Sequence, residues 1–180
     1  MKAAILYQKV HDKSAADELD VLVQKDEIAR VLQELGHDVI DVPVTLNLEM
    51  LKSILLDAKP HFVFNLVESI DGSGQILHFV PALLEHLAIP FTGAGADSMY
   101  LSTNKILAKE RLQSFGIATP PWGVNERPGF GGPYIVKPVS EDASVDIDED
   151  MVVSDVEELN LLLVKKQKAG RFFIEQFIAG

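Results

Sequence analysis

Two lysines of the sequence stand where an ammonium group could hold a phosphate. Lys137 ends an apolar run that begins at residue 134, so its stem would be buried in a strand and its ammonium would emerge beside a polar loop. Lys105 lies in the first turn of a predicted helix, where a cation opposes the helix dipole and a nearby anion would offset that cost. Taken alone, each position is more typical of a lysine whose ammonium reaches water.

The final segment of the sequence could contact a nucleotide base. Glu175 and Gln176 follow the apolar run 172–174, and Ile178 lies two residues further on. An adenine ring needs one backbone donor and one backbone acceptor from an extended segment with apolar walls. Residues 175–178 could supply both groups, although many strands could do so, and Glu175 could face either solvent or a pocket.

The other polar motifs predict no catalytic centre. Residues 71–74 and 93–95 are glycine-containing segments that favour tight turns, and neither matches a Walker A sequence or a dinucleotide fingerprint. The five histidines lack metal-ligand spacing, so no metal site is predicted from them. Cysteine is absent, which excludes disulfides and thiolate chemistry. Three serines lack the context of a nucleophile elbow: Ser69, Ser73 and Ser102.

The net charge of −11 is concentrated in one stretch of the 180 residues. Residues 141–160 contain nine acidic residues and no basic one, whereas the rest of the chain contains 18 acidic and 16 basic residues. An acidic protein repels nucleic acid and anionic lipid, so we expect neither as a partner. The sequence has no apolar run near the ~20 residues of a membrane helix. Residues 1–12 also lack the apolar core of a signal peptide, which predicts a cytoplasmic protein.

Strand and helix signals alternate in the first half of the chain and define the elements that would position these residues. Strands separated by helices through short connections predict a parallel sheet that is covered on both faces. Ligands of such sheets bind at the carboxyl ends of the strands. The predicted strands are 2–7, 38–44, 61–66 and 89–92, and the predicted helices are 19–35, 47–59 and about 74–87.

The pattern changes after residue 95. Proline- and glycine-rich stretches interrupt the chain near residue 120 and at 128–133. Short strands with one longer helix predict a small α+β unit, so we expect two domains, 1–95 and 96–180. The predicted elements are helices 102–115 and 154–168 and strands 134–138, 144–147, 151–153 and 171–178.

Five short motifs occur in a fixed order from residue 63 onwards. They are Val63-Phe64-Asn65-Leu66, Pro90-Phe91-Thr92-Gly93, Asn104-Lys105, Gly116-Ile117-Ala118-Thr119-Pro120 and Ile135-Val136-Lys137-Pro138. Together and at this spacing they resemble the ATP-grasp ligases, above all D-alanine–D-alanine ligase and its relatives. The resemblance covers residues 60–180, and the combination of motifs is specific although no single motif is.

The resemblance implies an α/β fold in which a Rossmann-like, parallel-sheet domain of the pre-ATP-grasp type precedes a small α+β ATP-grasp subdomain. It also implies a ligase that uses ATP and Mg²⁺. The family transfers a phosphoryl group from ATP to a carboxylate, and an amine then attacks the acyl phosphate to form an amide. The expected partners are therefore small-molecule carboxylate and amine substrates.

The resemblance also assigns roles to individual residues. Lys105 and Lys137 match the two lysines that hold the ATP phosphates. Residues 141–145 match the loop that folds over the triphosphate, with Ser144 as one of its serines. The segment that links the two ATP-grasp subdomains and meets adenine through its backbone corresponds to Glu175, Gln176 and Ile178.

The sequence departs from the family at three places. Residues 8–16 lack the glycine-rich motif that holds the first amino acid, which leaves the substrate open. Asp146 stands where the family usually has glycine. The sequence ends at Gly180, before the region in which the family carries its Mg²⁺ ligands and catalytic arginine, so no catalytic residue is assigned.

We therefore expect a truncated ligase that is inactive as it stands. The alternatives are a non-catalytic nucleotide-binding module and a dimer-forming remnant that binds no nucleotide. A chain that ends at residue 180 would leave strand 171–178 with an exposed edge and uncovered apolar side chains, which predicts a homodimer.

Overall fold

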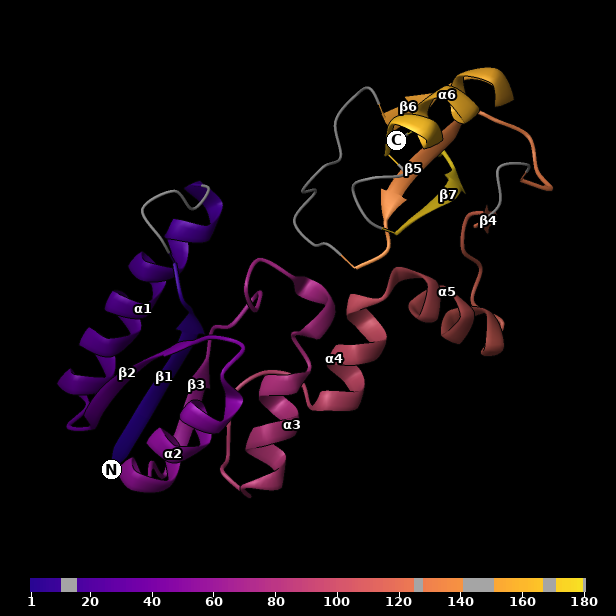
Figure 1. Cartoon of the computed structure of the whole chain (residues 1–180). Coiled ribbons are helices and arrows are strands. Elements are labelled where there is room, and N and C mark those ends of the chain that lie inside the picture. Colours follow the sequence, from indigo (N-terminus) through magenta and orange to yellow (C-terminus); the bar gives the residue numbers. More distant parts are fainter. Residues whose placement is uncertain (11–15, 125–127, 141–150, 167–170, 180) are drawn as a thin grey trace. The chain divides into compact units, whose positions relative to one another are not determined.

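The chain forms two compact units in a computed structural model, Met1–Tyr100 and Leu101–Gly180. Each unit contains a sheet of its own, and Figure 1 shows the elements of both. The structure describes residues 1–10, 16–124, 128–140, 151–166 and 171–179.

The sheet of the first unit has three parallel strands in the order β2-β1-β3. The strands are β1 (Lys2–Gln8), β2 (Asp38–Val44) and β3 (Phe62–Asn65). The apolar run of β1 is buried because this strand lies in the centre and pairs on both edges. The prediction of a parallel sheet in the first half is confirmed.

Helices cover both faces of this sheet. Helix α1 (Ala16–Glu34) packs against β1 and β2. Helices α2 (Leu48–Ala58) and α3 (Phe79–His86) contribute Leu51, Leu55, Val80 and Leu84 to the main core of the unit, together with Ala4 and Leu6 of β1. Because side chains alternate along a strand, Ala3 and Ile5 lie on the other face, and both are fully buried.

Local sequence signals set the ends of the first two helices. Asn47 caps α2 by accepting a hydrogen bond from the Met50 N–H at 3.0 Å. Gly36 follows α1 at φ +81°, a conformation that favours glycine, and its N–H donates to the Gln33 carbonyl. Both caps agree with the sequence prediction.

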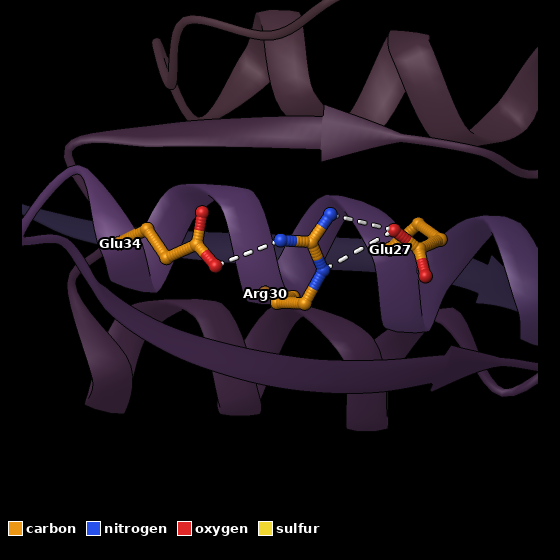
Figure 2. A network of polar contacts seen from close by, with 3 residues as sticks. All are labelled: Glu27, Arg30 and Glu34. Atoms are coloured by element: carbon orange, nitrogen blue, oxygen red, sulfur yellow. Dashed lines mark hydrogen bonds and ion pairs between the residues drawn. The ribbon is translucent and has the colours of Figure 1, made fainter.

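An exposed ion-pair network runs along α1. The guanidinium of Arg30 lies between Glu27 and Glu34, one turn away on either side, as Figure 2 shows. The hydrogen bonds that the Arg30 guanidinium donates to Glu27 and Glu34 raise the pKa of Arg30 above its ordinary value. All three side chains are more than half exposed, so water and salt screen the interaction and the network stabilises the helix only weakly.

The segment between β3 and the second unit departs from the sequence prediction. Residues 89–92 form no extended strand; Phe91 makes a single parallel bridge to Val63. The 3-10 helix η1 (Gly74–Ile76) precedes α3, where one continuous helix was expected. The predicted helix 102–115 corresponds to α5 (Lys105–Ser114), and a further helix, α4 (Ala96–Thr103), precedes it and was for the most part not predicted.

The sheet of the second unit has four strands in the order β4-β7-β5-β6, and every pair is antiparallel. Helix α6 (Val156–Lys166) buries Leu159 and Leu162 in the core of this unit. The strands are β4 (Trp122–Gly123), β5 (Tyr134–Pro138), β6 (Val152–Val153) and β7 (Phe172–Gln176).

The capping residue of α6 is Asp155, and the helix begins two residues later than predicted. The Asp155 carboxylate accepts hydrogen bonds from the N–H groups of Glu157 and Glu158, and the Glu158 carboxylate accepts one from the Ser154 N–H. Together the two carboxylates satisfy three N–H groups at the start of α6, in the manner of a capping box.

Strand β7 is an inner strand, which corrects the expectation of an exposed edge. It pairs with β4 on one side and with β5 on the other. Phe173 and Ile174 are each only 1% exposed, whereas Ile178, beyond the strand, is 61% exposed. The strand therefore finds its apolar partners within the second unit.

Candidate functional site

The candidate site lies on the face of the second sheet that is opposite α6. Tyr134, Val136 and Ile174 point into the core beneath α6. Because side chains alternate along each strand, Lys137 of β5 and Glu175 of β7 lie on the other face. Ile135 is directly opposite Glu175, so Lys137 and Glu175 are diagonal neighbours across two adjacent strands.

The Glu175 carboxylate is the centre of a buried ion-pair cluster. Its side chain is 6% exposed, and each of its two oxygens contacts a different lysine. Oε2 accepts a hydrogen bond from Lys137 Nζ at 2.6 Å, and Oε1 pairs with Lys109 Nζ. A carboxylate buried to this degree is stable only when opposite charges compensate it, and the cluster provides two.

The cluster has a net charge of +1, and the exposure of its members is uneven. The Lys109 side chain is 11% exposed and the Lys137 side chain 29%. Lys137 is therefore the member through which an external anion can reach the surplus positive charge. A phosphate is an anion of this kind.

Lys109 lies on helix α5, and this helix positions its ammonium against Glu175 of the sheet. Asn104 caps the helix by accepting hydrogen bonds from the N–H groups of Ile106 and Leu107, each at 3.1 Å. The N–H of Lys105 donates to the Val139 carbonyl at 2.9 Å, which ties the start of α5 to the chain just after β5. Lys105 and Lys109 are four residues apart and so share one face of the helix. Lys105 thus lies in the first turn of α5, as predicted.

Two backbone groups lie at the end of β7 and just beyond it. The N–H of Gln176 donates to the Pro121 carbonyl at 2.8 Å. Because Pro121 is a proline, it has no N–H that could donate a hydrogen bond to the Gln176 carbonyl. Ile178 lies two residues later, beyond the end of β7, and its N–H makes no hydrogen bond to the residues that the structure describes. A backbone acceptor on Gln176 is thus followed two residues later by a backbone donor on Ile178.

An edge-to-face aromatic contact adds an apolar part to the same face of the sheet. The rings of Trp122 and Phe173 are 6.5 Å apart between centroids and nearly perpendicular. Phe173 alternates with the core residues of β7 and so lies on the Glu175 face.

The predicted site residues therefore fall into two groups. Lys137 lies on β5, Glu175 and Gln176 lie on the neighbouring strand β7, and Ile178 lies just beyond β7. Lys105 begins helix α5, whose Lys109 contacts Glu175. Ser144, together with the predicted loop 141–145 and strand 144–147, lies outside the described residues.

Lys109 is the site residue that sequence reasoning missed. A lysine within a helix is normally a solvated side chain, and nothing in the composition of α5 marks it as buried. The available signal was its spacing: Lys109 follows Lys105 by four residues, so any surface that one contacts is within reach of the other.

Polar residues also close the carboxyl ends of the parallel strands in the first unit. The Oε1 atom of buried Gln8 accepts from the Glu68 N–H at 3.2 Å, and the Thr92 hydroxyl accepts from the Asn65 N–H at 3.0 Å. Both bonds are made by neutral side chains, in contrast to the ion pairs of the second unit.

No three His, Asp or Glu side chains among the described residues gather as ligands for a metal ion. Within the same ranges, no helix has the length and apolarity required to cross a membrane.

The chain is similar to D-alanine–D-alanine ligases in sequence and in fold. It is 32% identical over 160 residues to the D-alanine–D-alanine ligase of Aquifex aeolicus, a match that covers 85% of this chain and 52% of the relative. The crystal structure of D-alanine–D-alanine ligase from Bacillus anthracis has a TM-score of 0.75 at 20% identity and covers 100% of this chain and 58% of that one. The same enzyme complexed with ATP has a TM-score of 0.72 at 22% identity, with 100% and 60% coverage.

The resemblance inferred from the five motifs is confirmed by these relatives. The fold is a mixed α/β fold with a three-stranded parallel sheet and a separate antiparallel sheet, and it matches solved D-alanine–D-alanine ligases. The chain spans about half the length of the curated relative. No family model matches it.

Proposed function

We propose that the chain is the amino-terminal and central part of an ATP-grasp carboxylate–amine ligase similar to D-alanine–D-alanine ligase. The observation that carries this proposal is the Lys109–Glu175–Lys137 cluster, whose surplus positive charge lies on the strand next to the adenine-type backbone pair of Gln176 and Ile178. A nucleoside triphosphate requires both features, a cation for its phosphates and a donor–acceptor pair for its base.

The proposal assigns each group a role in nucleotide binding. The ammonium groups of Lys105 and Lys137 neutralise the phosphates, and fixed positive charge of this kind also stabilises a phosphoryl group in transfer. The Gln176 carbonyl accepts a hydrogen bond from the adenine amino group, and the Ile178 N–H donates one to the neighbouring ring nitrogen. Ser144 belongs to the proposal through the sequence resemblance alone.

In the proposed reaction, a carboxylate oxygen of the first substrate attacks the γ-phosphorus of ATP, and ADP leaves. The amine of the second substrate then attacks the acyl carbon, an amide bond forms, and inorganic phosphate leaves with the former carboxylate oxygen. Mg²⁺ would shield the phosphate charges during the first step. Among the described residues, no three His, Asp or Glu side chains lie together as ligands for this ion.

The finer features of the fold and the assembly are part of the same proposal. We propose that the first unit is a Rossmann-like pre-ATP-grasp domain and the second a partial ATP-grasp subdomain. We further propose a cytoplasmic homodimer. Exposed apolar residues of α6 support self-association, since Leu161 and Val164 are each 67% exposed and lie three residues apart on the helix surface.

Calorimetric titration of the chain with ATP tests the proposed function. We expect binding that depends steeply on Mg²⁺, because the acidic stretch 141–160 follows β5 in the sequence and disfavours a bare triphosphate. Lys105→Ala and Lys137→Ala should each weaken binding by about tenfold or more, since each removes a charge-assisted contact.

The matched control is Lys165→Ala, an exposed lysine at the end of α6, which should leave the affinity for ATP unchanged. Absence of ATP binding, or binding that is equal with and without Mg²⁺ and unaffected by the two site variants, would contradict the proposal.

A further inference from the structure

Lys109 is buried in the candidate site but does not reach its exposed side. Its side chain is 11% exposed, and its ammonium pairs with Glu175 Oε1, whereas Lys137 occupies Oε2. The three charges come from α5, β5 and β7, so the cluster joins three elements of the second unit. A phosphate that arrives at the exposed side therefore meets Lys137 before it meets Lys109.

The charge balance of the cluster depends on which lysine stays with the carboxylate. If Lys137 turns toward a phosphate, Glu175 loses its partner at Oε2 but keeps Lys109 at Oε1. A buried carboxylate with one close ammonium remains compensated, whereas a buried carboxylate with no partner is strongly unfavourable. Without Lys109, Lys137 could leave only at that larger cost.

We propose that Lys109 is a positioning residue that compensates Glu175 permanently and thereby frees Lys137 to bind a nucleotide phosphate. This inference rests on the proposed function, and it assigns a role to a residue outside the set that the motifs selected. Lys109 acts through Glu175 and makes no contact with the ligand.

Loss of the Lys109 charge should weaken the binding of phosphates in particular. In Lys109→Met the carboxylate retains Lys137 alone, so Lys137 stays with Glu175 and the phosphates lose their cation. The affinity for ATP should fall about tenfold or more relative to the affinity for adenosine, which carries no phosphate. The adenosine affinity, measured for every variant, corrects for any general distortion of the base site.

A double variant separates positioning from a merely structural role. In Lys109→Met/Glu175→Gln the carboxylate charge is gone, so nothing holds Lys137 and the ATP-to-adenosine affinity ratio should return to within a few-fold of wild type. Loss of packing alone would instead leave the double variant as impaired as the single one. Lys165→Met is the matched control and should leave the ratio unchanged.

The experiment is isothermal titration of each folded variant with ATP and with adenosine in the presence of Mg²⁺, with circular dichroism as the check of folding. An unchanged ratio in Lys109→Met, or no recovery in the double variant, overturns the inference while ATP binding by wild type keeps the proposed function. A wild-type chain that fails to bind ATP overturns both. Should Lys109→Met not fold, Glu175→Gln alone decides: we expect a ratio at or above that of wild type, and a fall overturns the inference.

Discussion

Lys25 links helix α1 to the first sheet through an ion pair. Its ammonium lies 2.7 Å from Asp41 of β2, also pairs with Asp26, and is 5.7 Å from the centroid of the Tyr7 ring. The side chain is only 12% exposed. The hydrogen bonds that the Lys25 ammonium donates to Asp26 and to Asp41 raise the pKa of Lys25 well above its ordinary value.

We predict that Lys25→Met lowers the free energy of unfolding by about 1 kcal/mol, the size of a well-formed and partly buried ion pair. Because the folded pKa lies above the unfolded value of 10.5, the contribution is complete below that pH and is lost as the pH rises through the folded pKa. Urea unfolding of both proteins should therefore give a constant difference from about pH 7 to 9 and a smaller one at higher pH.

The control is Lys52→Met, since Lys52 pairs with Glu49 at 3.4 Å on an exposed turn of α2. That variant should be close to wild type in stability. An equal effect of both substitutions would mean that Lys25 contributes no more than an ordinary surface charge.

At the scale of single residues, the sequence identified Lys137 and Glu175 as candidate site residues but did not predict that they pair with each other. Lys137 and Glu175 are 38 residues apart, and only the antiparallel register of β5 and β7 brings them together. The sequence left open whether Glu175 faces solvent or a pocket, and the structure buries it between two lysines. A contact between distant residues requires knowledge of the strand pairing, which a single sequence does not contain.

Helix α5 shows how one cap can hold an element of the candidate site. Asn104 satisfies two N–H groups of the first turn. We predict that Asn104→Ala destabilises the protein by about 1 kcal/mol, because both donors lose their acceptor. Thermal or urea unfolding measures the change.

Asn47→Ala is a matched comparison for that prediction, because Asn47 caps α2 in the other unit. If the two units unfold in separate transitions, Asn104→Ala should shift the transition of the second unit and Asn47→Ala that of the first. An Asn104→Ala protein as stable as wild type would show that α5 is held by its tertiary contacts alone.

At the scale of elements, the ends of a helix or strand could be predicted where the local sequence signal was strong, and could not where it was weak. Asn47 and Gly36 fixed the ends of α2 and α1 because a cap acts through its immediate neighbours. Asn104 is an equally good cap, but the predicted helix 102–115 ran through it, and residues 96–101 of α4 were not predicted as a helix. Strand β4 was missed because it has two residues and follows two prolines.

The whole chain presents apolar side chains that its own two cores leave uncovered. Leu161 and Val164 on α6 are each 67% exposed, and Ile178 is 61% exposed. We predict that the chain self-associates, because burial of each such side chain contributes ~1.5–3 kcal/mol, against the entropic cost of association. Light scattering across a concentration series should show an average mass that rises above 19.8 kDa.

The variant Leu161→Gln/Val164→Gln should remain monomeric at concentrations where wild type associates, since it removes both apolar side chains from α6. Val23→Gln is the control, because Val23 is 62% exposed on α1 of the other unit. A wild-type chain that stays monomeric into the high micromolar range would contradict the prediction.

The overall architecture was the feature most accessible from the sequence. Apolar strand-like runs alternate with helix-like segments in the first half of the sequence, and this alternation predicted the parallel sheet. After residue 95 the alternation gives way to short strands and breaker residues, which indicated a different kind of unit. The position of β7 was not accessible, because an apolar strand looks the same at an edge and in the centre of a sheet.

The border between the two units falls within helix α4, between Tyr100 and Leu101. The N–H of Ala96, the first residue of α4, donates to the Glu85 carboxylate of the first unit, whereas the last residue of α4 directly precedes Asn104, the cap of α5. To express either unit by itself, the chain would have to be cut within this helix of eight residues or at one of its ends. A cut within the helix divides it, and a cut at an end removes the neighbour that satisfies the backbone groups there. A protein that begins at Leu101 would start with three residues of a helix whose first turn is missing. A recombinant protein for work on the candidate site should accordingly begin before Gly95 or keep both units in one polypeptide.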